Sequence, residues 1–329
     1  MINMRRKPVR HRAAPREMLQ MSAPAAALIT ALILHLALPN VYPENYKSDT
    51  YPVFLQICLV VYTPFFLFAV LGSRLKAKLL HLSWLLAAAV LLIAALDIAT
   101  LKTGHLRLPF VPSPDKILST VPENWQILLE SLYHSLRLLI TGLVVGVFCG
   151  LISGVLMGWN KICNYWFTPV LKIIGPIPGA ALLPIFVVIF PSNRTASIAI
   201  IVLHIWFPLT LMLSSAIRNI DKRHIEVARV LGAGDWYILR RVALPAAMPA
   251  IFNGLFMGTC ASFGALVFAE MLGVEAGLGW FITWSKAWGE YAKIYCTVII
   301  FVIVCFTILS ILFKVRNRIL RWRKGTLRW

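Results

Sequence analysis

Long runs of apolar residues, each about twenty residues in length, occupy most of the chain. At least eight windows are long and apolar enough to span a membrane: about 21–39, 52–72, 79–100, 127–158, 167–190, 196–217, 246–272 and 294–313. Lipid offers no hydrogen-bond partner to a free backbone group, so these runs must become helices. Only 14% of the 329 residues are charged, against about a quarter in soluble domains. The sequence therefore predicts an all-α polytopic membrane protein with about eight transmembrane helices.

Basic residues indicate how these spans cross the membrane. Most of the 32 lysines and arginines gather in four segments, 1–20, 73–78, 218–243 and 314–329. With eight spans all four segments lie on one side, which the positive-inside rule assigns to the cytoplasm. A cleaved signal peptide would share the basic-then-apolar layout of the first forty residues, but no small-x-small cleavage site follows, which favours an uncleaved anchor. We predict a multi-pass protein of the bacterial inner membrane with both termini in the cytoplasm.

A polar and basic island, residues 219–249, interrupts the apolar runs. Its first half places Ile225, Ala228 and Leu231 on one side of a short amphipathic helix. Gly232-Ala233-Gly234 then breaks the helix. Asp235 is positioned to cap a second helix, Trp236 to Leu244, which Pro245 would stop. A helix-turn-helix can also read DNA, but a loop tethered at both ends to membrane spans could hardly reach a major groove. We predict a docking element for a partner protein and no nucleic-acid partner.

The residues of this island resemble a known motif. Glu226-Val227-Ala228, then Gly232, then Val242-x-Leu244-Pro245 resemble the EAA loop of ABC-importer permeases, with Val227 in place of the usual first alanine. The run AEMLGVEAGLGWFI, residues 269–282, is similar to the branch named for nitrate, sulfonate, taurine and bicarbonate uptake. The resemblance covers about residues 79–320, as a six-helix core with a cytoplasmic coupling loop at 219–249. Residues 1–78 would then be a basic N-terminus with two additional spans, and 321–329 a basic tail.

The resemblance implies a type I importer. Such an importer contains two permeases, here expected as a homodimer, with a cytoplasmic ABC ATPase dimer and an extracytoplasmic solute-binding protein. The chain contains no GxxxxGK[ST] phosphate loop, so ATP and Mg would be used by the partner ATPase, and we expect no catalytic residue, metal or cofactor in this chain. The resemblance places the ATPase-docking residues at Glu226, Val227, Ala228, Leu231, Gly232, Ala233, Leu244 and Pro245.

The resemblance leaves the solute open. The branch suggests a small anion such as a sulfonate, taurine, nitrate or bicarbonate, but relatives of similar sequence also carry pyrimidines and aromatic acids.

Several residues within the apolar runs are candidates for the solute pathway. Pro176 and Pro178 bend the fifth predicted span, and broken helices line many transport pathways. Glu270 ends the seventh span and would either hydrogen-bond the glycine-rich turn or contact the solute. Trp280, with further tryptophans four and eight residues on, would form an interfacial belt or a gate.

Other features of these runs point to packing. Glycines at intervals of four, from Gly142 to Gly158, predict close helix packing. We expect Asp97 to reach solvent at the end of its span and His35 to be a packed residue, and prolines to prevent a regular helix over most of 101–126. Arg137 should face protein, water or a head group.

Two other functional classes remain as alternatives. An ion-coupled secondary transporter would need intramembrane acids or histidines in matched positions of two inverted halves, and we find no such repeat. A membrane enzyme would need a cluster of His, Asp or Glu, whereas these residues are scattered. The six cysteines form no CxxC pair and indicate buried apolar positions. A non-transporting membrane assembly protein would leave the polar island unexplained.

Overall fold

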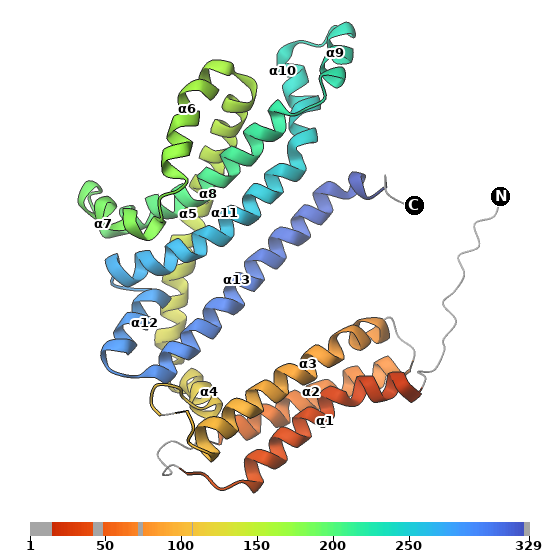
Figure 1. Cartoon of the computed structure of the whole chain (residues 1–329), viewed down its shortest axis with the longest axis vertical. Helices are drawn as coiled ribbons and strands as arrows, with labels where there is room; N and C mark the ends of the chain where they lie inside the picture. Colours follow the sequence, from red (N-terminus) through yellow and green to blue (C-terminus); the bar gives the residue numbers. More distant parts are fainter. Residues whose placement is uncertain (1–14, 42–48, 72–74, 107, 326–329) are drawn as a thin grey trace, which may run out of the picture. The chain divides into compact units, whose positions relative to one another are not determined.

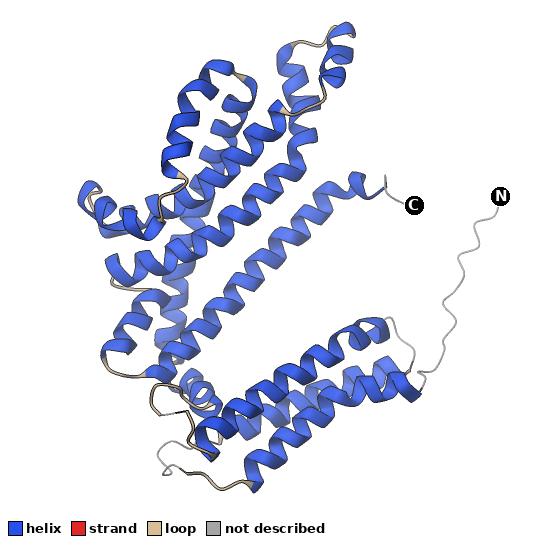
Figure 2. Cartoon of the chain, viewed as in Figure 1, coloured by secondary structure: helices blue, strands red, loops and turns tan. Residues whose placement is uncertain are grey.

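The computed structural model describes residues 15–41, 49–71, 75–106 and 108–325. Within these ranges it contains helices and loops and no strand (Figure 2). The all-α prediction is therefore confirmed. Several predicted basic and turn segments lie outside the described residues: 1–14, 42–48, 72–74 and the end of the tail, 326–329.

Seven helices in the described ranges are long and apolar enough to cross a membrane (Figure 1). The chain is thus a multi-pass membrane protein, as predicted. The helices that form these spans are α1 (Pro15–Ala37), α2 (Thr50–Val70), α3 (Leu75–Asp97), α5 (Trp125–Trp159), α8 (Asn193–Arg218), α11 (Leu244–Gly273) and α13 (Tyr291–Ile319).

The fifth predicted span, 167–190, is not one helix. It consists of α6 (Lys161–Ile174) and α7 (Gly179–Ile189), separated at residues 175–178. Pro176 and Pro178 lack the backbone N–H that a continuous helix needs at those positions, which explains the break. α6 begins at Lys161, and the Asn160 side chain caps it by accepting a hydrogen bond from the backbone N–H of Ile162 at 2.8 Å.

The broken pair α6 and α7 nevertheless leads the chain back from the end of α5 to the level at which α5 began. A Cβ on Gly142 of α5 would meet Ile201 of α8, and a Cβ on Gly158 would meet Ile217. Residue numbers rise together along both helices, so α5 and α8 run parallel. The connection between them must therefore lead from one end of the pair to the other. Besides the seven continuous candidate spans, the described ranges therefore contain one broken return segment, α6 with α7.

The chain divides into two compact units, the first formed by residues 1–125 with 288–296. In it α3 packs on α1 and α2, whereas the sequence analysis placed residues from 79 onward with the core. The loop predicted at 101–126 contains a helix, α4 (Pro114–Glu123). Pro114 is tolerated because it lies in the first turn, where its missing N–H has no helical partner anyway.

A buried polar pair joins α1 to α3 in this unit. Nδ1 of His35 lies 2.7 Å from Oδ2 of Asp97, and both side chains are almost fully buried. The ring of Tyr51 packs edge-on against His35. Nζ of Lys102, from the π-helical turn η2 (Ile98–Lys102), donates to the carbonyl of Leu38 at 2.7 Å beyond the end of α1. The expectation that Asp97 reaches solvent is wrong, because its carboxylate has a partner on α1.

Replacing His35 by alanine is expected to destabilise the first unit. The change leaves the Asp97 carboxylate buried without its imidazole partner, and losing such a partner costs about 1–3 kcal/mol. Thermal unfolding in detergent, followed by the fluorescence of a thiol-reactive dye or by light scattering, measures the loss. His81→Ala on α3 is the matched control, since His81 is exposed. Equal melting temperatures for the two variants would contradict a stabilising pair.

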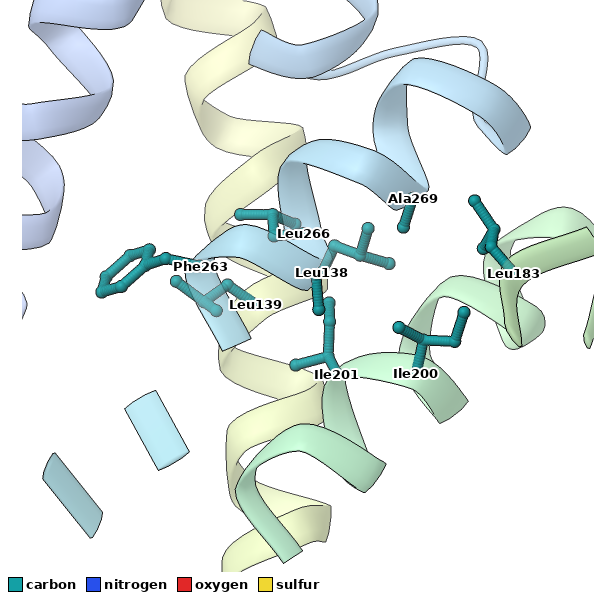
Figure 3. Close-up of a cluster of buried hydrophobic side chains, with 9 residues drawn as sticks. Leu138, Leu139, Leu183, Ile200, Ile201, Phe263, Leu266 and Ala269 are labelled. Atoms are coloured by element: carbon teal, nitrogen blue, oxygen red, sulfur yellow. The ribbon is translucent and has the colours of Figure 1, made fainter. Parts of the chain in front are cut away.

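The second unit comprises residues 126–287 with 297–329. Its core gathers side chains from α5, α7, α8 and α11 (Figure 3): Leu138, Leu139, Leu183, Ile200, Ile201, Phe263, Ala265, Leu266 and Ala269. Partly buried residues of α13, including Phe301 and Ile308, pack against this cluster. Helices far apart in sequence thus share one apolar centre.

Glycines bring α8 close to both α5 and α11. A Cβ on Gly150 or Gly154 of α5 would lie 2.9 Å from Leu209 or Leu213 of α8. On α11, a Cβ on Gly254 would lie 2.9 Å from the Cα of Leu209 itself. Real Cβ atoms do not tolerate such contacts, so only glycine permits these approaches. The predicted groove on 142–158 is confirmed, and the sequence analysis missed the second one on α11.

Candidate functional site

The polar island forms an exposed hairpin at the end of the second unit where α8 ends and α11 begins (Figure 1). Its first helix is α9 (Lys222–Val230), in which no residue is buried. The Asp221 side chain caps it by accepting a hydrogen bond from the backbone N–H of Arg223 at 3.0 Å. Val230 and Leu231 are 87% and 80% exposed. Apolar side chains this exposed outside the apolar spans are typical of a contact surface for another protein.

Gly232 ends α9 with a left-handed turn. Its φ is +83°, a value that disfavours any residue with a Cβ. The Ala233 N–H donates to the carbonyl of Ala228 at 3.0 Å, and the Gly232 N–H donates to that of Arg229 at 2.9 Å. These two bonds form a Schellman motif, which satisfies carbonyls at the end of the helix. The break predicted at Gly232 is confirmed in position and in cause.

The second half of the hairpin differs from the prediction. A four-residue helix, α10 (Asp235–Ile238), leads through the π-helical turn η3 (Leu239–Ala243) directly into α11. Pro245 does not stop this helix but lies in the first turn of α11, where proline is tolerated. Asp235 is not the capping residue, since Gly234 occupies that position. Its Oδ1 instead lies 3.2 Å from Nη2 of Arg229 on α9, an exposed ion pair across the turn.

One continuous helical segment therefore runs from the hairpin through the membrane. It extends over 39 residues, from Asp235 to Gly273. Gly254 and Gly258, near the middle of this segment, allow it to pack closely against the backbone of α8.

Five of the predicted docking residues line one hollow beside the turn: Val227, Ala228, Leu231, Gly232 and Ala233. Its volume is about 560 Å³, and His224, Gly234, Tyr237 and Val242 complete its lining. Glu226 is exposed on α9 but does not line the hollow. Leu244 lies elsewhere, in an apolar hollow of about 660 Å³ between α5 and α11. The hairpin thus offers an apolar depression with an acidic residue near it.

Glu270 is buried at the other end of α11, with 1% of its surface exposed. Its Oε2 accepts a hydrogen bond from the backbone N–H of Gly279 at 2.8 Å. Gly277, with φ of +133°, packs directly against the carboxyl group. Ser135 of α5 accepts a hydrogen bond from the backbone N–H of Leu278 at 2.8 Å. Ser135 was not among the predicted residues, and no spacing in the sequence indicates it, because it lies 143 residues from Leu278.

The remaining pathway candidates lie in separate places. Pro176 lines a hollow of about 610 Å³ with Lys172 and Arg218. Pro178 precedes the first residue of α7 as its N-cap. Trp280, on α12 (Leu278–Ala287), stacks on Trp284 with ring centroids 6.2 Å apart. Among the described residues, no hydrogen bond or ring contact joins these three to Glu270. The described ranges also contain no cluster of His, Cys, Asp and Glu suited to a metal ion.

Comparison with known proteins identifies the family. Residues 142–324, more than half of the chain, match the model described as the inner membrane component of binding-protein-dependent transport systems. The chain belongs to this family. It is a membrane permease component of an importer that works with a binding protein, and the matched segment contains the hairpin, the glycine grooves and the Glu270 turn.

Two relatives of this permease show its branch. It is 29% identical over 226 residues to the putative aliphatic sulfonates transport permease SsuC of Bacillus subtilis, covering 68% of this chain and 81% of that protein. It is 26% identical over 220 residues to the taurine transport permease TauC of Escherichia coli, covering 65% and 80%. Both matches leave about a third of this chain uncovered.

A solved structure shares the fold of the permease. A chain of the MetNI methionine ABC transporter, in an inward-facing conformation, superposes with a TM-score of 0.53 at 21% sequence identity. The match covers 60% of this chain and 98% of the MetNI chain. Nearly the whole of that MetNI chain therefore corresponds to 60% of this permease.

Proposed function

We propose that this permease forms the solute pathway of an ATP-driven importer and is driven through the hairpin of residues 219–249. The hollow beside Gly232 carries the proposal, because it combines an apolar lining with unusually exposed side chains at the end of two membrane helices. The chain contains no phosphate loop of its own. A cytoplasmic ABC ATPase dimer would bind α9 and would use ATP and Mg. This chain would then have no catalytic role.

The hairpin has a geometry suited to transmitting movement. α9 is fastened to the start of α10 by the Schellman turn and by the pair Arg229–Asp235. From Asp235 the helical segment continues through the π-helical turn η3 into the membrane helix α11. A displacement of α9 by ATPase closure would therefore tilt α11 as a rigid body, which can open the pathway to alternate sides.

The proposed assembly follows the family. A second copy of this chain would complete the pathway, and an extracytoplasmic binding protein would deliver the solute. The hairpin and both termini would lie in the cytoplasm, in agreement with the basic segments. In this proposal Glu270 braces the turn at Gly277 to Gly279 and does not contact the solute, as its buried hydrogen bond to Gly279 supports. The solute would be a small anion, because the relatives named for a solute above carry sulfonates.

A photo-crosslinking residue at position 230 is expected to capture the ATPase. Val230 is the most exposed apolar side chain of α9, and replacing it with p-benzoylphenylalanine leaves the buried residues untouched. Illumination of membranes that contain the whole transporter should give an adduct with an ATP-hydrolysing subunit. The same residue at Lys286, exposed on α12, is the control and should give no such adduct. Absence of the adduct at position 230, or equal adducts at both positions, would refute the coupling role.

A further inference from the structure

Another hollow lies at the end of the second unit where α8 begins and α11 ends. Its volume is about 370 Å³. α5 contributes His134 and Arg137, the start of α8 contributes Arg194, and the segment after α11 contributes Glu275 and Ala276. The function proposed above uses none of these side chains.

The two arginines of this hollow have no ion-pair partner among the described residues. Arg137 and Arg194 are both exposed, and neither forms an ion pair with any residue in the described ranges. Glu275 in the same lining is the single carboxylate against two guanidinium groups. The amino end of α8, a 26-residue helix, adds the positive end of its dipole. The hollow therefore has a positive excess that the chain itself does not neutralise.

The position of these cations opposes the usual charge bias. α8 ends at the hairpin and begins at this hollow, so the two sites lie at opposite ends of one membrane helix. With the hairpin in the cytoplasm, the hollow lies at the outer face, where lysines and arginines are normally depleted. An arginine within a span is costly unless it faces water or a partner. The presence of Arg137 and Arg194 at this face therefore requires a functional explanation.

We infer that this hollow binds a small oxyanion, first of all a sulfonate, at the outer mouth of the uptake pathway. The guanidinium groups of Arg137 and Arg194 would hold the sulfonate oxygens, since planar guanidinium donors match such anions. A volume of about 370 Å³ lies at the small end of ligand pockets, which favours a small molecule over the surface of a protein. The inference rests on the proposed import function, and it names the class of solute and the residues that receive it.

Cysteine labelling measures the charge of the hollow without ATP, partners or transport. Ala276→Cys places a thiol in the lining. The full chain in nanodiscs of neutral phosphatidylcholine is treated with a thiosulfonate reagent carrying a sulfonate or with one carrying a trimethylammonium group. Mass spectrometry of the peptide with residue 276 separates this thiol from the six native cysteines. The measured quantity is the ratio of the labelling rate with the anionic reagent to that with the cationic reagent. We expect this ratio to be higher at position 276 than at a cysteine that replaces Lys286.

The arginines should account for this preference. Arg137→Gln together with Arg194→Gln is expected to lower the ratio of anionic to cationic labelling about fivefold or more, the size expected for removing two nearby charges. Lys286→Gln removes one exposed charge from α12, outside the hollow, and is expected to leave the ratio unchanged. An unchanged ratio in the double arginine variant would overturn the inference.

Competition distinguishes a binding site from general attraction and from a lipid site. Ethanesulfonate should slow labelling at position 276 more than chloride at equal ionic strength, and the difference should vanish in the double arginine variant. Equal effects of the two salts would mean that charge screening alone acts, and the inference would be wrong. If position 276 is protected from labelling only when phosphatidylglycerol replaces part of the neutral lipid, the hollow binds a lipid head group. That outcome would also overturn the inference.

Failure of this inference is separable from failure of the proposed function. If Val230 gives no ATPase adduct, the import function falls whatever the labelling shows. If the adduct forms, and the assembled transporter takes up a solute that the double arginine variant takes up equally well, only the oxyanion site is refuted. A panel of taurine, ethanesulfonate, nitrate and a neutral pyrimidine identifies that solute.

Discussion

Gly232→Pro is expected to abolish solute uptake while the membrane helices remain folded. Proline fixes φ near −65°, whereas Gly232 has φ of +83°. The substitution also removes the N–H that donates to the carbonyl of Arg229. The Schellman turn would be lost, and α9 could no longer keep its angle to the 39-residue segment that begins at Asp235.

Uptake into vesicles that contain the assembled transporter measures this effect. We expect a fall of about tenfold or more, because coupling between two sites typically amounts to ~1–3 kcal/mol. Stimulation of the ATPase by the binding protein should fall in parallel, and the same outcome is expected for Glu226→Lys, which replaces the one carboxylate of α9 by a cation. Gly232→Asn is the matched control, since asparagine keeps the backbone N–H and takes the left-handed conformation at a helix C-terminus more readily than other residues with a Cβ. Normal uptake by Gly232→Pro would show that the turn does not couple the two proteins.

Gly146→Leu is expected to prevent α5 from packing against α8. A Cβ on Gly146 would already meet Ile205, and it would lie 2.9 Å from the backbone carbonyl oxygen of Val202. A backbone atom cannot rotate away as a side chain can, so the two helices would have to separate. Overpacking of this severity costs about 3 kcal/mol or more, a large part of a total stability of ~5–15 kcal/mol.

The yield of monodisperse protein in detergent and its melting temperature measure this loss. Gly264→Leu on α11 is the control, because an added Cβ at Gly264 meets no atom within 4 Å. We expect the control to remain folded and the Gly146 variant to aggregate or to melt at a clearly lower temperature. If both variants behaved alike, close packing on the α5 glycines would not be needed for the fold.

Local sequence signals identified the features of this permease that depend on neighbouring residues. Glycine at intervals of four between Gly142 and Gly158 predicted the packing face of α5, because the spacing alone puts those residues on one side of a helix. The glycine at position 232 predicted the end of α9 for a similar reason, since a left-handed turn favours a residue without a Cβ. The hollow beside Gly232 depends on this turn and on the apolar residues next to it in sequence.

The errors arose where distant residues decide the local structure. Asp97 looked like a residue at the end of a span, and only the approach of His35 on α1 gives it a buried partner. Pro245 looked like a stop signal, but it follows the π-helical turn η3 and lies in the first turn of α11, where a missing backbone N–H is tolerated. Glu270 could be placed at a helix end from the sequence, yet its hydrogen bond to Gly279 depends on how α12 folds back.

The continuous segment from Asp235 to Gly273 has a mechanical consequence. At about 1.5 Å per residue it is roughly 58 Å long, and its glycine seat on α8, Gly254 and Gly258, lies near its midpoint. If the segment turns about this contact in the proposed importer, its two ends move in opposite directions. Movement of the hairpin end would then be accompanied by opposite movement of the Glu270 end, and the two mouths of the proposed pathway would not be open at the same time.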